Sequence, residues 1–234
     1  MKIRVFALAL ICLLLSGCGN SATQPEQTAV PVSTEAAEEE PVSAVVEETA
    51  APAVIRPLPD TTMEARNDSI LHVSFAEDGI YRDEAGKVLL RVQIYTYDKF
   101  DMVDISGLNA GDTILLCGEE ITVSAVETNA HGTVLVNGGL DEGGFDLATD
   151  DSGVYYAQGY SDMKSWILAG EAEFPVSEGF VFRDSADLET GVAEYTAEDL
   201  LAGIPAAMFG YQPHNTTVRV ENGQVAEMER IYTP

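Results

Sequence analysis

The loop formed by residues 140–153 carries the densest group of side chains that could do chemistry. Its sequence, LDEGGFDLATDDSG, contains the carboxylates of Asp141, Glu142, Asp146, Asp150 and Asp151. Converging carboxylate oxygens bind hard cations such as Ca²⁺, and two facing carboxylates can act as the acid and base of a glycosidase. The spacing fails the EF-hand pattern, because Gly143 and Phe145 occupy positions that require oxygen ligands. We therefore predict no metal site and interpret the loop as a solvated connection; a hydrolase that uses carboxylates of residues 141–151 is the alternative.

A serine and a lysine three residues apart form a second candidate. Ser161 and Lys164 match the S-x-x-K pattern of the penicillin-binding proteins, in which the two residues lie one helical turn apart. That chemistry also requires S-D-N and K-T-G elements, and neither occurs in this sequence. We therefore interpret the segment as a polar turn in front of Trp166.

The main aromatic cluster of the sequence consists of Tyr155, Tyr156, Tyr160 and Trp166. Adjacent residues of a strand point to opposite faces, so at least one of Tyr155 and Tyr156 is expected outside the core. An exposed aromatic surface outside the cell can stack on sugars, whereas aromatic residues in sheets usually serve packing. Both interpretations stay open at this point.

The histidines and cysteines show no spacing that is typical of a metal or nucleophile site. His72, His131 and His214 are far apart and have no second ligand at metal-binding spacing. Cys117 follows the apolar run ILL, so we predict a buried and unreactive side chain. No phosphate-loop, dinucleotide or zinc-protease motif is present. We assign no catalytic, cofactor-binding or metal-binding residue and expect no cofactor.

Short runs of aromatic and β-branched residues, separated by Gly, Asp and Asn, begin at about residue 66. We predict strands in the segments 69–75, 87–97, 112–127 (two strands around Gly118–Glu119), 131–139, 152–160, 178–184 and 216–232. Many short strands at this spacing indicate an all-β barrel or sandwich, mostly antiparallel. The absence of βαβ units argues against a parallel sheet.

One short helix is predicted, near residues 197–208 within the segment TAEDLLAGIPAAMFG (196–210). Thr196 can cap its first turn, and the acidic residues Glu198 and Asp199 lie at its positive end. Gly203 and the proline that follows limit the helix to about two turns.

The C-terminal segment TTVRVENGQVAEMERIYTP is predicted to be a hairpin that belongs to the fold. Asn222–Gly223 can adopt the positive φ angles of a two-residue type I′ turn. The register set by this turn places an acidic residue of the second strand on the buried face. A bulge near residues 226–227 corrects the alternation and turns Met228 or Ile231 inward. A short helix in the second arm is the alternative.

Residues 1–17 have the composition of an export signal. Lys2 and Arg4 precede the apolar run VFALALICLLL, which is too short to span a bilayer permanently. The next residues, LSGC at positions 15–18, resemble the lipobox of bacterial lipoproteins. That resemblance implies that the sulfur of Cys18 receives a diacylglyceryl group and that the signal is removed just before it. Durable anchoring needs two or more acyl chains.

Residues 18–60 are predicted to be a disordered, acidic linker. Within them, residues 19–55 contain no Lys, Arg or aromatic residue. Such a segment cannot bury enough apolar surface to offset its chain entropy, and a flexible chain of this length reaches about 35 Å. Residues 66–234 are predicted to form the folded region, either as one β domain or as two small subdomains that meet near residues 140–152.

The charge of the chain limits its partners. The formal net charge of −27 becomes −29 when Lys2 and Arg4 leave with the signal. A surface of this charge repels phosphates and anionic headgroups, so we expect no nucleic-acid partner and no membrane contact beyond the acyl chains on Cys18. The sequence predicts a lipid-anchored protein of the cell membrane that faces away from the cytoplasm. We expect a non-enzymatic binding or interaction module for an unknown extracellular ligand or protein.

Overall fold

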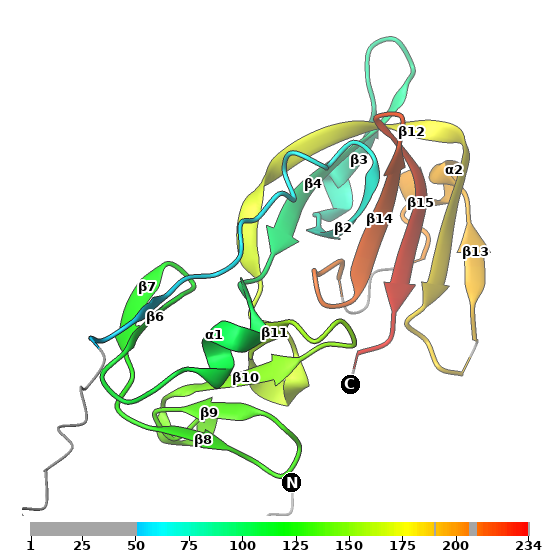
Figure 1. The fold of residues 1–234 in the computed structure, drawn as a ribbon. Helices are drawn as coiled ribbons and strands as arrows, with labels where there is room; N and C mark the ends of the chain where they lie inside the picture. Colours follow the sequence, from blue (N-terminus) through cyan, green and yellow to red (C-terminus); the bar gives the residue numbers. More distant parts are fainter. Residues whose placement is uncertain (1–50, 190, 206–209, 234) are drawn as a thin grey trace, which may run out of the picture. The chain divides into compact units, whose positions relative to one another are not determined.

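The computed structural model describes residues 51–189, 191–205 and 210–233, which belong to one compact unit (Figure 1). Its strands are β1 (Val54–Ile55), β2 (Ser69–Ser74), β3 (Ile80–Arg82), β4 (Val88–Thr96), β5 (Lys99–Phe100), β6 (Thr113–Leu116), β7 (Glu119–Thr122), β8 (Val126–Thr128), β9 (Val134–Val136), β10 (Phe145–Thr149), β11 (Tyr155–Gln158), β12 (Ile167–Ser185), β13 (Ala193–Tyr195), β14 (Thr216–Glu221) and β15 (Gln224–Ile231). The helices are α1 (Met102–Ser106) and α2 (Ala197–Leu201), with 3₁₀ turns at 77–79, 140–142 and 160–162. The predicted all-β fold is confirmed.

Five strands close into a barrel. β2 pairs with β4 and β14, β14 pairs with β15, and β12 pairs with both β15 and β4. Around the barrel the order is therefore β2-β4-β12-β15-β14, which is first, second, third, fifth and fourth along the chain. Of the two predicted alternatives, barrel and sandwich, these strands form the barrel.

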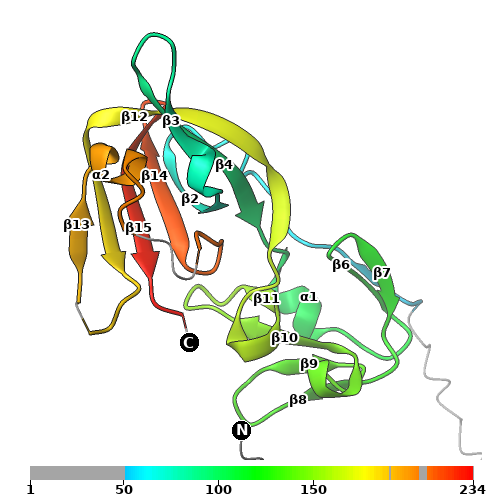
Figure 2. The same cartoon turned by 180° about the vertical axis from the view of Figure 1, so that it is seen from behind.

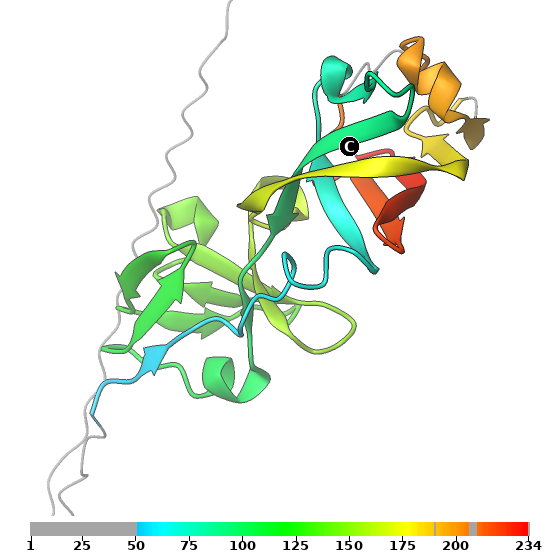
Figure 3. The same ribbon diagram turned by 90° about the horizontal axis from the view of Figure 1, so that it is seen from above.

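The longest strand, β12, closes the barrel because its two halves have different partners. Residues 167–175 pair antiparallel with β4, residues 176–185 pair parallel with β15, and the register is irregular between Val176 and Val181. Figure 3 shows the first half of β12 running beside β4. The sequence predicted only residues 178–184 as a strand, because the first half contains small and charged residues (AGEAE) in place of β-branched ones. The β12–β15 and β1–β6 pairs are parallel, whereas the other strand pairs of the described residues are antiparallel.

Apolar side chains that alternate along the strands fill the barrel. None of the following is more than 3% exposed: Leu71, Val73, Leu90, Val92, Ile94, Phe174, Phe182, Val218, Val220, Val225 and Met228. Asp184 and Arg230 lie two residues beyond Phe182 and Met228 and are also buried. The aromatic ring of Tyr211 packs against this end of the core, with its centroid 5.0 Å from the guanidinium carbon of Arg230.

The C-terminal hairpin forms as predicted, and Figure 2 shows it from behind as β14 and β15. The turn residues 222–223 have φ angles of 50° and 72°, which a type I′ turn requires. The register shifts by one residue after the Val220–Val225 pair, which is the predicted bulge. Met228 is fully buried and Ile231 is 44% exposed, so the bulge turns Met228 inward. The second arm is a strand, and the helical alternative is wrong.

The residues between β4 and β12 form further sheets around a second hydrophobic core. The strand orders are β5-β11-β10-β9-β8 and, with the N-terminal strand, β1-β6-β7. The second core contains Ile55, Phe100, Ile105, Leu108, Ile114, Leu116, Val123, Val134, Val136, Leu147 and Ala157. The chain leaves the barrel core after Ile94 and returns to it before Phe174. Residues 140–152, the boundary of the two-subdomain alternative, include β10, which pairs with β9 and β11 inside the five-stranded sheet.

β1 corrects the predicted end of the linker. Val54 and Ile55 pair with residues 113–114 of β6, and Ile55 is only 9% exposed within the second core. Backbone pairing and one buried apolar side chain are enough to include this segment in the fold, although its composition resembles that of the preceding residues. The sequence therefore placed the start of the folded region too late, at residue 66.

A buried carboxylate also holds the chain that enters β1. Asp112 is 7% exposed and accepts hydrogen bonds from the backbone N–H groups of Ala53 (2.7 Å) and Asn109 (2.8 Å). The predicted signal, Cys18 and most of the predicted linker fall within residues 1–50, outside the described residues.

The predicted helix forms but is shorter than expected. α2 begins at the Thr196 cap, where the Asp199 carboxylate accepts from the Thr196 backbone N–H (2.8 Å) and the Thr196 hydroxyl accepts from the Asp199 N–H (3.3 Å). It ends at Leu201, before Gly203 with φ of 75°, and residues 206–209 lie outside the described residues. The sequence missed α1, because a five-residue helix with one buried side chain, Ile105, has no detectable periodicity.

Candidate functional site

Three polar side chains form a row across the outer surface of the barrel, one from each of β2, β4 and β12. Ser74 pairs in register with Gln93, and Gln93 pairs with Glu171. Their neighbours Val73, Val92 and Ile94 point into the core, so alternation along each strand places the row outside. β2, β4 and β12 are each paired with a strand on both sides, so the row lies within the sheet and not at its edge.

Hydrogen bonds fix the orientation of this row. The Oε1 atom of Gln93 accepts from the hydroxyls of Ser74 (3.3 Å) and Tyr95 (3.1 Å). Its Nε2 atom donates to Oε1 of Glu171 at 3.2 Å. Since these bonds settle which end of the amide donates, one amide hydrogen of Gln93 and Oε2 of Glu171 are left without a hydrogen bond to the described part of the chain.

A second polar group lies two residues further along the same strands. Arg91 of β4 is paired with Glu173 of β12, and its Nη2 atom lies 3.2 Å from the Tyr81 hydroxyl and 3.3 Å from Oε2 of Glu173. The Tyr81 hydroxyl also donates to Glu173, and this hydrogen bond raises the pKa of Tyr81. The hydrogen bonds of Arg91 to Tyr81 and Glu173 raise the pKa of the guanidinium, which stays charged.

An aromatic pair forms the apolar side of the site. The rings of Phe75 and Tyr211 are stacked, with centroids 4.1 Å apart and an interplanar angle of 12°. Tyr211 is 6% exposed, and its burial raises the pKa of the phenol, so the hydroxyl stays neutral. The pair is held by the backbone bridge between Phe75 and Tyr211.

The row, Arg91 and the aromatic pair line a groove of about 440 Å³. Its polar lining consists of Ser74, Asp78, Arg91, Gln93, Glu171 and Gln212, and its apolar lining consists of Phe75, Ala76, Gly79, Val92 and Tyr211. Gly79 permits a close approach of two chain segments, because a Cβ atom there would lie 3.0 Å from the carbonyl oxygen of Arg91. The volume falls within the range of about 300–1,000 Å³ that is typical of small-molecule sites.

The charges in the groove are of both signs. Asp78 and Glu171 contribute carboxylates, and Arg91 contributes a guanidinium. An ionic ligand of either sign would meet repulsion from one of these groups, whereas a hydroxyl can donate to a carboxylate and accept from the guanidinium or an amide. The arrangement can therefore hold and orient a neutral polar molecule.

The carboxylates of the 140–153 loop lie outside this groove. Oδ1 of Asp146 accepts from the backbone N–H of Leu140 at 2.9 Å. Oδ1 of Asp150 accepts from the hydroxyl and backbone N–H of Ser152 (2.5 and 2.9 Å), and the hydroxyl bond is the main cause that lowers the pKa of Asp150. Asp146 lies on β10, where its carboxylate holds the turn at Leu140, and Asp150 holds the turn that follows the strand, while Asp141, Glu142 and Asp151 are exposed. Because residues 145–149 form a strand of the sheet, the prediction of a solvated connection is wrong for that part of the segment. Within the described residues, no group of three or more His, Cys, Asp or Glu side chains could hold a metal ion.

The predicted aromatic cluster divides between the core and a separate contact. Tyr155 packs against the second hydrophobic core, whereas its neighbour Tyr156 contacts Tyr97, with ring centroids 5.8 Å apart. Trp166 contacts Tyr97 at 5.4 Å, and Tyr160 is 77% exposed. None of the four predicted aromatic residues lines the groove.

The serine and lysine of the S-x-x-K pattern do not form a pair. Ser161 lies in a 3₁₀ turn with φ of 59° and not at the start of an α-helix. The Nζ atom of Lys164 donates to the hydroxyl of Tyr97 at 3.0 Å and lies 4.1 Å from the centroid of that ring. The interpretation of residues 161–164 as a polar turn agrees with this geometry.

Cys117 is exposed, so the prediction of a buried side chain is wrong. It is the first residue of the turn between β6 and β7, with φ of 51°, and the run of apolar residues ends one position before it. The thiol is still partly desolvated, and this burial raises its pKa, as do the nearby carboxylates of Asp98 and Glu119. A protonated thiol is a poor nucleophile.

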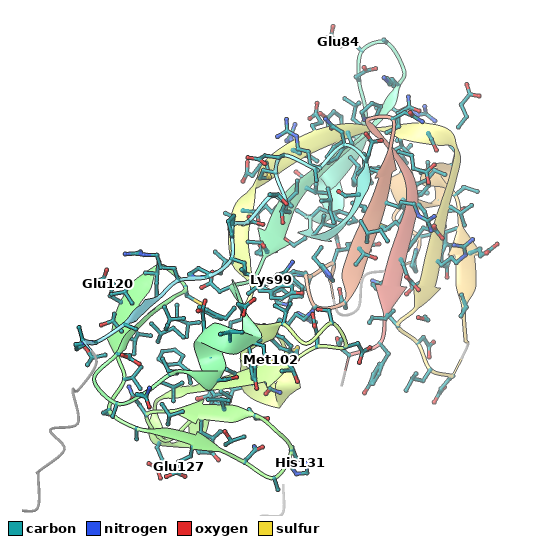
Figure 4. All side chains as sticks on the ribbon, viewed as in Figure 1. Glu84, Lys99, Met102, Glu120, Glu127 and His131 are labelled. Carbon is teal, nitrogen blue, oxygen red and sulfur yellow. The ribbon has the colours of Figure 1, made fainter. Side chains whose placement is uncertain are left out.

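The histidines occupy unrelated positions. His72 lies on β2, as predicted, whereas His131 lies in the turn that precedes β9 and is labelled in Figure 4. His214 lies in the turn before β14. His72 is two residues from Ser74 on the same face of β2, and His214 is two residues from Gln212, so both follow or precede a groove residue closely in the chain.

No family model, curated protein or solved structure matches the sequence. Within the described ranges, no helix is long and apolar enough to cross a membrane.

Proposed function

We propose that the barrel binds an uncharged, hydroxyl-rich ligand such as an oligosaccharide in the groove over β2, β4 and β12. The mature protein carries this binding module on a lipid anchor at Cys18 and presents it outside the cytoplasm. The observation that carries the proposal is the oriented Gln93–Glu171 pair, which offers one amide donor and one carboxylate acceptor side by side. Adjacent hydroxyls of a sugar each donate and accept, so they fit such a pair.

The topology argues against one other ligand class, and the net charge argues against a second. A peptide that binds as an added strand needs a free sheet edge, but β2, β4 and β12 have partners on both sides in the barrel. A nucleic acid would be repelled by a mature chain with a formal charge of −29, given the −27 of the whole sequence and the removal of Lys2 and Arg4.

The order of the barrel strands supports the location of the site by analogy. Five-stranded Greek-key barrels of the OB type bind ligands over their second and third strands and the loop between the first and second. In this barrel these elements are β4, β12 and residues 75–87, and they supply Arg91, Gln93, Glu171 and Asp78 to the groove.

The anchored location is supported by the sequence alone. The signal-like residues 1–17 and the LSGC run that ends at Cys18 are typical of bacterial lipoproteins. A binding module that lacks an assigned catalytic residue suits a protein that holds its ligand at the membrane surface. We therefore propose a non-enzymatic role.

The test is a binding measurement on the mature chain in a detergent without sugar headgroups. Cellotriose, chitotriose and maltotriose serve as neutral probes, and the side-chain amide resonance of Gln93 reports on the groove. We expect at least one probe to shift this resonance, and Glu171→Ala to weaken binding about tenfold or more through loss of a charged hydrogen bond. Glu229→Ala is the matched control, because Glu229 is an exposed strand glutamate outside the groove. Equal loss in both variants, or no binding of any probe, would overturn the proposal.

A further inference from the structure

A row of apolar side chains crosses the outer surface of the barrel beside the groove. Tyr81 of β3 pairs in register with Leu89 of β4, and Leu89 pairs with Pro175 of β12. The following neighbours of these residues in the chain are buried in the barrel core: Ile80, Leu90 and Phe174. Alternation along the strands therefore places Tyr81, Leu89 and Pro175, here called the apolar row, on the outside, where all three are partly exposed.

The apolar row lies on the same face of the sheet as the groove. The outward positions of β4 are Gln93, Arg91 and Leu89, and each pairs in uninterrupted register with an outward residue of β12. Gln93 and Arg91 line the groove. Successive outward positions of a strand are about 6.6 Å apart, so these three extend over about 13 Å. The groove and the apolar row thus form one strip along β4 and β12.

Polar contacts hold the ring of Tyr81 in its place at one end of the strip. Its hydroxyl donates to Glu173, and Nη2 of Arg91 lies 3.2 Å from the same hydroxyl oxygen. The guanidinium carbon of Arg91 is 5.3 Å from the centroid of the ring. A side chain that is already held in one position loses little conformational entropy when a ligand packs on it.

The chemistry of the strip changes from one end to the other. At one end, Gln93 and Glu171 offer a donor and an acceptor to hydroxyls, whereas the Tyr81 end offers an aromatic ring. A sugar whose hydroxyls are equatorial matches both ends, because its hydroxyls project from the edge of the ring and its C–H bonds make the two faces apolar. A β-1,4-linked chain of such sugars is extended and flat like the strip, whereas an α-1,4-linked chain curves away from a straight line.

We propose that the groove continues over Tyr81 as a stacking subsite, and that its ligand is an extended, β-linked oligosaccharide of glucose-like sugars. The inference rests on the proposed function, because the Gln93–Glu171 pair is the other end of the same site. A trisaccharide is long enough to contact both ends at once. A single sugar is too short to do so.

The first test follows two groups of the mature chain in one titration, the side-chain amide resonance of Gln93 and the aromatic resonances of Tyr81. At least one β-linked probe, cellotriose or chitotriose, should shift both with the same Kd, because one molecule contacts both ends. Maltotriose is the α-linked control and should bind about threefold or more weakly. If the β-linked probes shift only one of the two groups, or if maltotriose binds equally well, the inference is wrong.

Two variants of Tyr81 test the stacking itself. Tyr81→Ala removes the ring and should weaken binding of the β-linked trisaccharide about three- to tenfold. Tyr81→Phe keeps the ring and should stay within about twofold of the parent. The matched control is Tyr160→Ala, because Tyr160 is 77% exposed and lies outside the groove and the apolar row. Equal affinity of Tyr81→Ala and Tyr160→Ala overturns the subsite, and the titration of the parent decides the matter if Tyr81→Ala fails to fold.

Failure of this inference differs from failure of the proposed function. If none of the trisaccharides binds, both are wrong. If Glu171→Ala weakens binding of a trisaccharide and Tyr81→Ala leaves it unchanged, the ligand occupies the groove without reaching the apolar row. That result contradicts the stacking subsite alone and leaves the proposed function in place.

Discussion

The guanidinium of Arg230 and the carboxylate of Asp184 form a bidentate ion pair at one end of the barrel core. Nε lies 2.9 Å from Oδ1, and Nη2 lies 2.5 Å from Oδ2. The side chains are 4% and 9% exposed, and the Nη1 atom of Arg230 is buried without a hydrogen bond to the described residues. The pair lies beneath Tyr211, so it supports the aromatic side of the groove.

Removal of one partner of the Arg230–Asp184 pair should lower the free energy of unfolding more than replacement of both partners. Asp184→Ala leaves a buried, unpaired guanidinium, and we expect the free energy of unfolding to fall by about 3–5 kcal/mol. The double variant Asp184→Leu/Arg230→Met removes both charges and should be clearly more stable than Asp184→Ala. Chemical denaturation measures both values, and a double variant as unstable as the single one would contradict this account.

The strand β1 should contribute to stability although it lies in a segment of linker-like composition. Ile55 is 9% exposed in the second core, so Ile55→Ala should lower the free energy of unfolding by about 2 kcal/mol or more. Its neighbour Val54 is 52% exposed, and Val54→Ala should change it by less than about 0.5 kcal/mol. Thermal or urea unfolding of the two variants provides the comparison. If Ile55→Ala changes the free energy of unfolding as little as Val54→Ala should, β1 lies outside the cooperative fold.

The bulge in β15 should determine which side chains of the last strand contribute to the stability of the fold. Met228 is fully buried, and Met228→Ala should cost about 2–5 kcal/mol, whereas Ile231→Ala at a 44% exposed position should cost far less. Deletion of residues 216–234 removes two barrel strands and should abolish cooperative unfolding. A truncated chain that melts at the parent temperature would refute the closed barrel.

Acid should weaken the loop that Asp150 holds. The pKa of Asp150 is lowered below its ordinary value of 3.8 by the Ser152 hydroxyl and by backbone N–H groups. Since the folded protein binds this proton less tightly than the unfolded chain, the stabilisation is present above about pH 4 and is lost as the pH falls through the folded-state pKa. Asp150→Asn should therefore lower the melting temperature at pH 7 and make less difference at pH 3. Asp151→Asn is the exposed control and should change the melting temperature at neither pH. If Asp150→Asn lowers the melting temperature equally at pH 7 and pH 3, the charge of Asp150 is not the cause.

The lipid anchor is tested at Cys18. When the gene is expressed in a bacterium, the mature protein should begin at a lipid-modified Cys18 and partition into the detergent phase. Cys18→Ala should abolish this partitioning, because no other thiol follows the signal segment directly. An alanine variant that stays membrane-bound after washing would mean that the apolar run is an uncleaved anchor.

None of the groove residues was predicted from the sequence. Ser74, Gln93 and Glu171 occupy outward positions of alternating strands, where a polar residue normally contacts only solvent. Their separations of 19 and 78 residues correspond to no motif, and only the register of β2, β4 and β12 brings them together. Tyr211 and Gln212 gave no signal either, because they lie outside the regular strands, where only a single bridge to Phe75 pairs Tyr211.

The sequence by itself determined the β class, most strand positions, the cap of α2, the turn at Asn222–Gly223 and the bulge that buries Met228. These features depend on alternation, capping and turn chemistry within a few residues. The tertiary structure decided which strands are neighbours, that β12 closes the barrel and that β1 joins β6. Those outcomes depend on contacts between residues that are distant in the chain, and local patterns of polarity are equally compatible with many such pairings.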